Sequence, residues 1–210
     1  MQDSRSKQER QFGREELAEF MDEVFGGEVH GQRLASLTDG VDGVLHAASL
    51  GVRAIGQGLA VAQGLAPRHA IKQVDRLLSN PKLSLEQVFS CWVPFVVGER
   101  REIFINFDWT EFADADQCTV VLGMQTEHGR STPLVWKTVT RSTLKDQRNN
   151  HEDDLLVMFA SVVPQNVRGT VVADRGFSDS KLYGFLTEEL GCDYILRFRG
   201  GVYVENAAGE

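Results

Sequence analysis

The chain has 210 residues, 25% of them charged, and a formal net charge of −8, which is the profile of a globular protein and excludes one that coats nucleic acid over its whole surface. No apolar run approaches the roughly 18 residues of a membrane-spanning helix, and the amino terminus is polar, so we expect neither a membrane partner nor a signal peptide. The cysteines Cys91, Cys118 and Cys192 are too few and too widely spaced for a disulfide framework or a zinc motif. These features predict a cytoplasmic protein.

A helical domain is predicted over residues 13–80, after a polar and flexible stretch over residues 1–12. Apolar residues at helical spacing predict a first helix over residues 13–25, which ends at a pair of glycines. A second helix is predicted within residues 28–50, although glycines interrupt its apolar pattern. The domain therefore begins as a small helical assembly.

Residues 52–79 have the pattern of a helix-turn-helix. The segment 52–63 is rich in alanine, valine, isoleucine and leucine, and a short glycine-containing turn follows it. Pro67 then opens a second helix, since proline is favoured at the first helical position, and Asn80 and Pro81 mark its end.

Basic side chains form a row along the second of these helices. They are four residues apart and therefore share one helical face. No acidic residue occurs between Asp42 and Asp75, so this stretch is locally basic in an acidic chain. The candidate DNA-binding residues are Arg68, Lys72 and Arg76 of this row, together with Arg53 of the preceding helix. A helical bundle whose charges are merely solvated has the same pattern and stays open as an alternative.

A linker is predicted over residues 81–101, and an α/β domain over residues 102–210. The α/β domain opens with candidate strands at residues 102–108, 117–126 and 132–140. The second alternates in the manner of an antiparallel meander. Trp92 and Trp136 are interpreted as core residues.

A polar loop is predicted over residues 141–150, and a helix is predicted to begin at the acidic cluster His151 to Asp154, because acids are favoured at a helix amino terminus. His151 or Asp153 as a metal ligand is the alternative. Beyond Pro164 we expect a strand over residues 170–173 that is buried on both faces of the sheet, because it lacks polar alternation. A helix over residues 179–190 and a strand over residues 193–198 should follow it.

Two apolar strands are each followed by an aspartate. Asp174 comes directly after Val171-Val172-Ala173, and Gly176 then permits a tight turn into the next helix. Asp108 likewise follows Ile103 to Phe107. Because the carboxyl ends of central strands are where open α/β sheets carry their chemistry, we expect these two aspartates to meet and share a divalent metal. A turn or helix-cap role is the alternative for each aspartate taken alone.

The motifs Phe107-Asp108-Trp109-Thr110 and Val172-Ala173-Asp174-Arg175-Gly176-Phe177, with the upstream helix Asp75-Arg76-Leu77-Leu78-Ser79-Asn80, resemble the DDE transposases of bacterial insertion sequences. The resemblance is to the cut-and-paste branch named after insertion sequence 4, and it runs from about residue 30 to the end.

This resemblance implies a ribonuclease-H-like mixed sheet, incomplete at the carboxyl terminus, preceded by a helical DNA-binding domain. It implies that Asp108 and Asp174 are the first two catalytic acids and ligands of Mg²⁺ or Mn²⁺, and that Arg175 meets phosphate. The partner would be double-stranded DNA at the transposon ends, with a homodimer as the candidate synaptic assembly, in the bacterial nucleoid.

The family's third acid is a glutamate in a motif with tyrosine, arginine and a later lysine, and no such motif is present. The resemblance therefore implies a transposase that stops before its third acid, and a chain that is inactive in strand cleavage. Three functions stay open. They are DNA transposition, an inactive DNA-binding remnant or inhibitor of a full-length transposase, and a metal-dependent nuclease that completes its site with Asp179 or Glu188.

Overall fold

The computed structural model describes residues 13–177 and 180–197. Contacts between residues divide the chain into two compact units, Met1–Cys91 and Trp92–Glu210, and the border lies inside helix α5 (Leu85–Val97). The segment interpreted as a linker therefore holds a helix. Pro94 lies within α5 and does not end it; the indole of Trp92 donates a hydrogen bond to the Pro133 carbonyl, 2.9 Å away, in the second unit.

The first unit is helical, and its described helices agree closely with the apolar periodicity of the sequence. They are α1 (Arg14–Phe25), α2 (Gly31–Ala47), α3 (Val52–Gln63) and α4 (Pro67–Leu78). The core between α3 and α4 consists of Ile55, Leu59, Ala60, Ala70 and Val74. Helix α2 is continuous, and its Gly43 allows α3 to approach closely. A Cβ on Gly43 would lie 2.6 Å from the carbonyl oxygen of Ile55 in α3.

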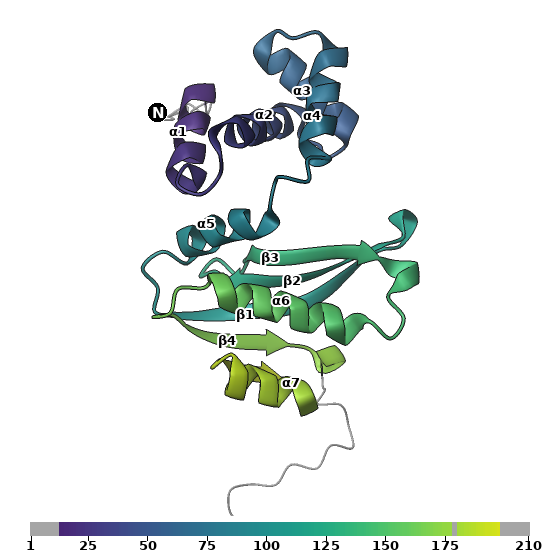
Figure 1. Cartoon of the computed structure of the whole chain (residues 1–210). Helices are drawn as coiled ribbons and strands as arrows, with labels where there is room; N and C mark the ends of the chain where they lie inside the picture. Colours follow the sequence, from purple (N-terminus) through teal and green to yellow (C-terminus); the bar gives the residue numbers. More distant parts are fainter. Residues whose placement is uncertain (1–12, 178–179, 198–210) are drawn as a thin grey trace, which may run out of the picture. The chain divides into compact units, whose positions relative to one another are not determined.

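The second unit is an α/β domain built on a five-stranded mixed sheet in the order β3-β2-β1-β4-β5 (Figure 1). Its strands are β1 (Glu102–Phe112), β2 (Gln117–Gln125), β3 (Ser131–Thr140), β4 (Arg168–Ala173) and β5 (Asp193–Leu196). β2 is antiparallel to both neighbours, whereas β4 is parallel to β1 and to β5. The α/β class expected from the sequence is confirmed.

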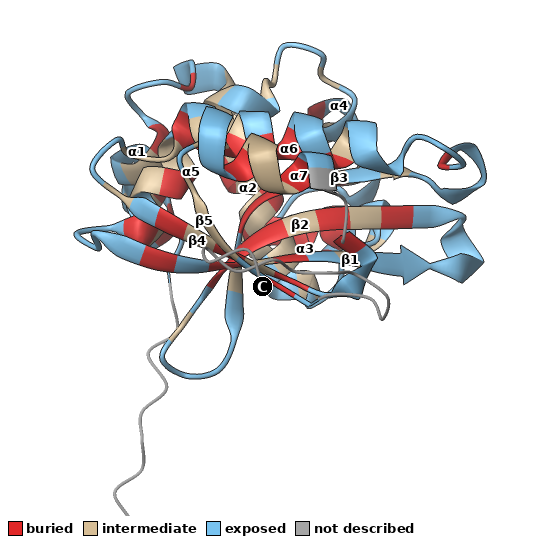
Figure 2. Ribbon diagram, turned by 90° about the horizontal axis from the view of Figure 1, so that it is seen from below, coloured by how far each residue is buried: buried red, intermediate tan, exposed pale blue. Residues whose placement is uncertain are grey.

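The helices of this unit cross between strands that run in the same direction. Helix α6 (Arg148–Val162) connects β3 to β4, and α7 (Ser180–Gly184), followed by the π-helical turn η4 (Phe185–Glu189), connects β4 to β5. Both crossovers progress toward the same sheet edge, so right-handed connections place both helices on one face. Figure 2 shows α6 and α7 on the same side of the strands.

The burial of the central strands follows from this one-sided cover. On β1 the side chains of Ile103, Ile105 and Phe107 are buried, whereas Phe104, which points the other way, is 53% exposed. Strand β4 shows the same alternation, with Val171 and Ala173 buried and Val172 half-buried. The expectation that this strand is buried on both faces is wrong.

Three further expectations need correction. Trp136 is 41% exposed rather than in the core, because its side chain lies on the less covered face of the edge strand β3. β1 does not stop at Asp108 but continues to Phe112, since its hairpin with β2 pairs residues as far as Phe112 and Gln117. Helix α6 begins at Arg148, three residues before the acidic cluster, so Glu152 lies inside the helix rather than at its start.

Among residues 13–177 and 180–197, no single helix has both the length and the apolar composition to cross a bilayer. Helices α2 and α3 reach that threshold only when they are counted together, and they are bent by 95° at the break between them.

Candidate functional site

The two predicted aspartates follow directly after paired residues of adjacent parallel strands. The register of β1 and β4 ends at Phe107 and Ala173, and the next residues along the two strands are Asp108 and Asp174. Because neighbouring strands lie about 4.8 Å apart, the two carboxylates start from adjacent backbone positions. Both residues are exposed.

Each carboxylate accepts a hydrogen bond from a backbone N–H just after it, in β1 for Asp108 and in the turn after β4 for Asp174. The backbone N–H of Trp109 donates to Asp108 Oδ1 at 2.8 Å, and the backbone N–H of Gly176 donates to Asp174 Oδ1 at 2.6 Å. Within the described part of the chain, neither Oδ2 atom accepts a hydrogen bond. Each aspartate therefore keeps one oxygen available to a cation, which is the donor type that Mg²⁺ and Mn²⁺ prefer.

Two aromatic rings join the strand ends that carry these aspartates. The rings of Phe107 and Phe177 have centroids 4.4 Å apart and are tilted by 33°. Both side chains are buried. Phe107 precedes Asp108 in β1, and Phe177 ends the short 3-10 turn η3 (Arg175–Phe177) that follows Asp174, so the contact ties β1 to the turn after β4. Arg175 is exposed in the same turn.

On the helical side of the sheet, Trp109 is anchored to α6. Its indole Nε1–H donates to Glu152 Oε1 at 2.7 Å, and the Arg148 guanidinium lies over the ring with Cζ 5.1 Å from the centroid. Arg148 also donates to Glu111 Oε1 at 2.9 Å, and Arg141 pairs with the other oxygen of Glu111 at 3.2 Å. Reasoning from sequence missed Glu152 and Arg148; no sequence spacing connects them to β1.

The other acids and the histidine considered as metal ligands do not join Asp108 and Asp174. In the part of the chain that the structure describes, no three His, Cys, Asp or Glu side chains are grouped so that they could hold a metal ion. The Nδ1 atom of His151 is buried without a hydrogen-bond partner in that part, and Asp153 and Glu188 are exposed. Asp179 lies outside the described residues.

An open groove of about 1250 Å³ lies beside the start of α6 and the α7–η4 segment. Its lining carries both charges, including Arg141, Lys181, Asp153 and Glu188. Neither Asp108 nor Asp174 lines it. The candidate metal centre is therefore an exposed strand end and not a cavity.

The predicted DNA-binding side chains of the helical unit are exposed. Arg68, Lys72 and Arg76 lie along α4 and Arg53 lies near the start of α3. Among the described residues none of these four forms an ion pair, so their charges remain available to a polyanion. The basic row is interrupted only by Asp75, which is also exposed.

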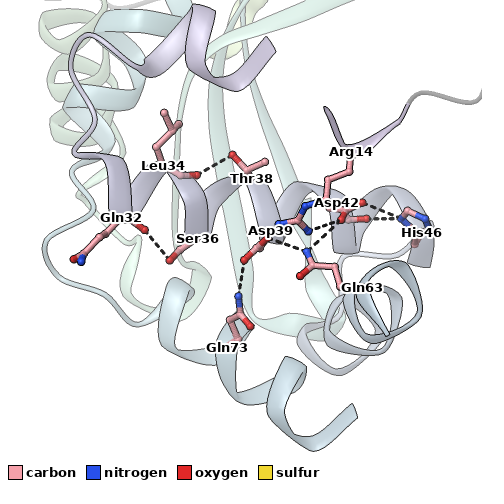
Figure 3. A network of polar contacts seen from close by, with 10 residues as sticks. All are labelled: Arg14, Gln32, Leu34, Ser36, Thr38, Asp39, Asp42, His46, Gln63 and Gln73. Atoms are coloured by element: carbon pink, nitrogen blue, oxygen red, sulfur yellow. Dashed lines mark hydrogen bonds and ion pairs between the residues drawn. The ribbon is translucent and has the colours of Figure 1, made fainter. Parts of the chain in front are cut away.

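A second polar cluster, which the sequence did not predict, lies inside the helical unit (Figure 3). The carboxylate of Asp42 is 5% exposed and is approached by Arg14 at 3.4 Å and by His46 Nδ1 at 3.1 Å. Gln63 Nε2 donates to Asp39 at 2.8 Å and to Asp42 at 3.4 Å. Donors from α1, α2 and α3 therefore surround a buried charge, and removing one of them would leave that charge less compensated.

Comparison with protein-family models and a search among curated proteins find no match to this chain.

Proposed function

We propose that this chain is a DNA-processing protein of the DDE transposase type, in which the helical unit binds DNA and Asp108 with Asp174 holds a divalent metal ion. The observation that carries the proposal is the register of β1 and β4, whose last pair is followed on each strand by an aspartate. One aspartate after a strand is a common turn residue. Two of them on adjacent parallel strands, each with one oxygen already oriented, favour shared metal binding.

The order of elements supports a ribonuclease-H-like domain. Three meandering strands are followed by α6, the parallel strand β4, the helical segment α7 and the parallel strand β5. That is the order expected of such a domain, and it brings the two motif aspartates to the same end of the sheet. The exposed basic row on α4 supports the DNA-binding half of the proposal.

The donor set fits Mg²⁺ or Mn²⁺, which prefer carboxylate oxygens and keep several bound waters. When bound, such an ion supplies Lewis-acid stabilisation of a phosphate and a more acidic water. The chain's own contribution is to hold two carboxylates on a rigid sheet end and to present Arg175 beside them, where a guanidinium can pair with a phosphate oxygen.

Manganese binding tests the proposal directly. Free Mn²⁺ is measured by electron paramagnetic resonance during titration of the wild-type protein, Asp108→Asn and Asp174→Asn. We expect binding by the wild type and its loss in both variants, since each removes one charged ligand. Asp114→Asn is the matched control, because Asp114 is also exposed but lies in the turn between β1 and β2. Absence of binding by the wild type, or equal binding by all four proteins, contradicts the proposed site.

A DNA-binding protein that does not cut strands is the second candidate. It is favoured because no third acid joins the pair among the described residues, and paired-ion cleavage uses more ligands than two carboxylates provide. Incubation of supercoiled plasmid with the protein and Mn²⁺ distinguishes the candidates. Nicking that Asp174→Asn abolishes supports phosphoryl transfer, whereas intact plasmid together with salt-sensitive binding supports the second candidate.

A further inference from the structure

We propose that Glu152 is a positioning residue for Asp108 and acts through Trp109. The inference rests on the metal-binding function proposed above. It concerns side chains on the sheet face that α6 covers, opposite to the face to which Asp108 points. It assigns a role to a buried acid that is not itself a ligand.

The first step is the burial of Glu152. Its residue exposure is 9%, and it lies within α6 against the sheet. A carboxylate removed from water is costly unless it accepts hydrogen bonds. The Trp109 indole provides one at 2.7 Å, and replacing either side chain removes this hydrogen bond. The contact therefore fixes the orientation of the indole.

The second step is the position of this contact along β1. Pairing between β1 and β4 ends at Phe107 and Ala173, whereas pairing between β1 and β2 continues to Phe112. Beyond Phe107, β1 is thus held by the sheet along one edge only. The ladder alone does not fix how far the end of β1 lies from the Asp174 turn. The Phe107–Phe177 contact constrains this distance at residue 107, and Trp109 and its contacts with α6 add a constraint beyond it.

The third step links the indole to the carboxylate. The backbone N–H of Trp109 donates to Asp108 Oδ1 at 2.8 Å, so the orientation of the Trp109 peptide sets that of the Asp108 side chain. Successive side chains of a strand point to opposite faces. Trp109 points to α6, and Asp108 points to the less covered face. Glu152 consequently acts from the sheet face opposite to Asp108. Arg148 lies over the same indole and helps to hold its orientation.

The first test does not depend on metal. Amide hydrogen exchange of residue 109 is measured by NMR in the wild type, Glu152→Met and Glu152→Gln. We expect loss of protection in Glu152→Met, because the indole is released and the local hydrogen bond from the Trp109 amide to Asp108 is weakened. Glu152→Gln retains an oxygen that accepts the indole hydrogen bond and should keep the protection. If Glu152→Met does not fold, Trp109→Phe is used in its place, because it removes the same hydrogen bond by removing the donor.

The second test is Mn²⁺ affinity. Residues that orient metal ligands typically change affinity by about 10-fold to 100-fold when removed. We expect about a tenfold weaker Kd in Glu152→Met and in Trp109→Phe, no further loss in the double variant, and near wild-type affinity in Glu152→Gln. Lys137→Met is the matched control, because it breaks another contact between the sheet and α6, the 2.8 Å ion pair with Asp154. Lys137 is level with Trp109 across the sheet but lies on β3, with β2 between it and β1.

The outcomes separate the two proposals. If the wild type binds Mn²⁺ while Glu152→Met and Trp109→Phe bind it equally well with unchanged protection, the positioning role is overturned and the metal site stands. If the wild type binds no Mn²⁺, the proposed function fails, and the exchange of the residue 109 amide alone decides whether Glu152 holds this part of β1. A loss of affinity in Lys137→Met equal to that in Glu152→Met also overturns the positioning role, since any loosening of α6 would then suffice.

Discussion

Phe107 and Phe177 touch across the end of the sheet, with ring centroids 4.4 Å apart. One precedes Asp108 and the other lies three residues after Asp174, so this apolar contact joins the strand and the turn that present the carboxylates. The two faces of the sheet end have different roles. Buried rings and the Trp109–Glu152 hydrogen bond hold the strand ends from the helical side, and the acids remain exposed on the other side.

Replacing Phe177 with leucine should weaken both the fold and the site. The ring pair is worth about 0.5–1.5 kcal/mol beyond its area, and leucine fills most of the buried volume, so we expect a loss of about 1 kcal/mol in the free energy of unfolding in urea. Mn²⁺ affinity should fall as well. Phe95→Leu is the aromatic control, because Phe95 is 46% exposed and its ring lies 6.0 Å from that of Trp92. An equal loss in both variants would show that the Phe107 contact has no special role.

Gly176→Ala should affect the site without affecting the fold. A Cβ at Gly176 would lie 2.8 Å from Asp174 Oδ1, and the atom that must move is the end of a side chain. We therefore expect a melting temperature close to that of the wild type and a weaker Mn²⁺ affinity, because the displaced oxygen belongs to the candidate ligand. Calorimetric melting checks the expected melting temperature, and manganese titration of the same preparation checks the expected loss of affinity. Unchanged affinity would mean that the position of Oδ1 does not matter for the ion.

The helical unit could be predicted from its sequence because its signals are local. Pro67 marks the start of α4, and Gly64 permits the left-handed turn, with φ of +65°, that ends α3. The pair Asp108 and Asp174 could also be selected, since an apolar run that ends in an acid is visible without a partner strand.

The support behind the site could not be predicted, because it is made by tertiary contacts. Glu152 and Trp109 are 43 residues apart in sequence, and the acidic run His151 to Asp154 resembles a helix start when read alone. Residue type favours a core position for Trp136, but exposure depends on which sheet face is covered. The sequence pattern of β3 does not contain that information.

Gly56 is required by the close packing of α3 on α4. A Cβ at this position would lie 2.5 Å from the Ile71 Cα, and backbone cannot move aside as a side chain can. Gly56→Ala should therefore destabilise the helical unit by about 1–3 kcal/mol, measured by thermal unfolding. Gly31→Ala, at the first residue of α2 where an added Cβ meets nothing within 4 Å, should be neutral or slightly stabilising. A neutral Gly56→Ala would contradict the close packing of α3 on α4.

Arg168 links β4 to β5 through Asp193, with Nε 2.5 Å from Oδ2. The hydrogen bond from Arg168, together with its charge, lowers the pKa of Asp193 below the ordinary value. A lowered pKa contributes stability that is present above the ordinary pKa and is lost as pH falls through the folded-state pKa. We expect Arg168→Met to raise the pKa of Asp193 toward its ordinary value in a carboxyl NMR titration. The stability deficit of this variant should be largest at neutral pH and should shrink in acid; a deficit independent of pH would exclude the ion pair as its cause.

The basic row on α4 makes a quantitative prediction about DNA. Each phosphate contact that is lost should reduce the slope of log K against log salt by about 0.9. Combined replacement of Arg68, Lys72 and Arg76 by alanine should therefore weaken binding to a mixed-sequence duplex and reduce the slope by about 2.7 if all three meet phosphates. Fluorescence anisotropy at several salt concentrations measures both quantities.

The control for this experiment is Lys82→Ala, which removes an equally exposed positive charge from the segment after α4. It should change the slope by no more than about 0.9, the contribution of one phosphate contact. Circular dichroism of the triple variant must match the wild type, as expected when exposed helix residues without ion-pair partners among the described residues are changed to alanine, the best helix former. If binding and slope survive in a folded triple variant, α4 is not the DNA-contacting helix. The basic row is then a solvated face of a helical bundle, and the DNA-binding half of the proposed function loses its structural basis.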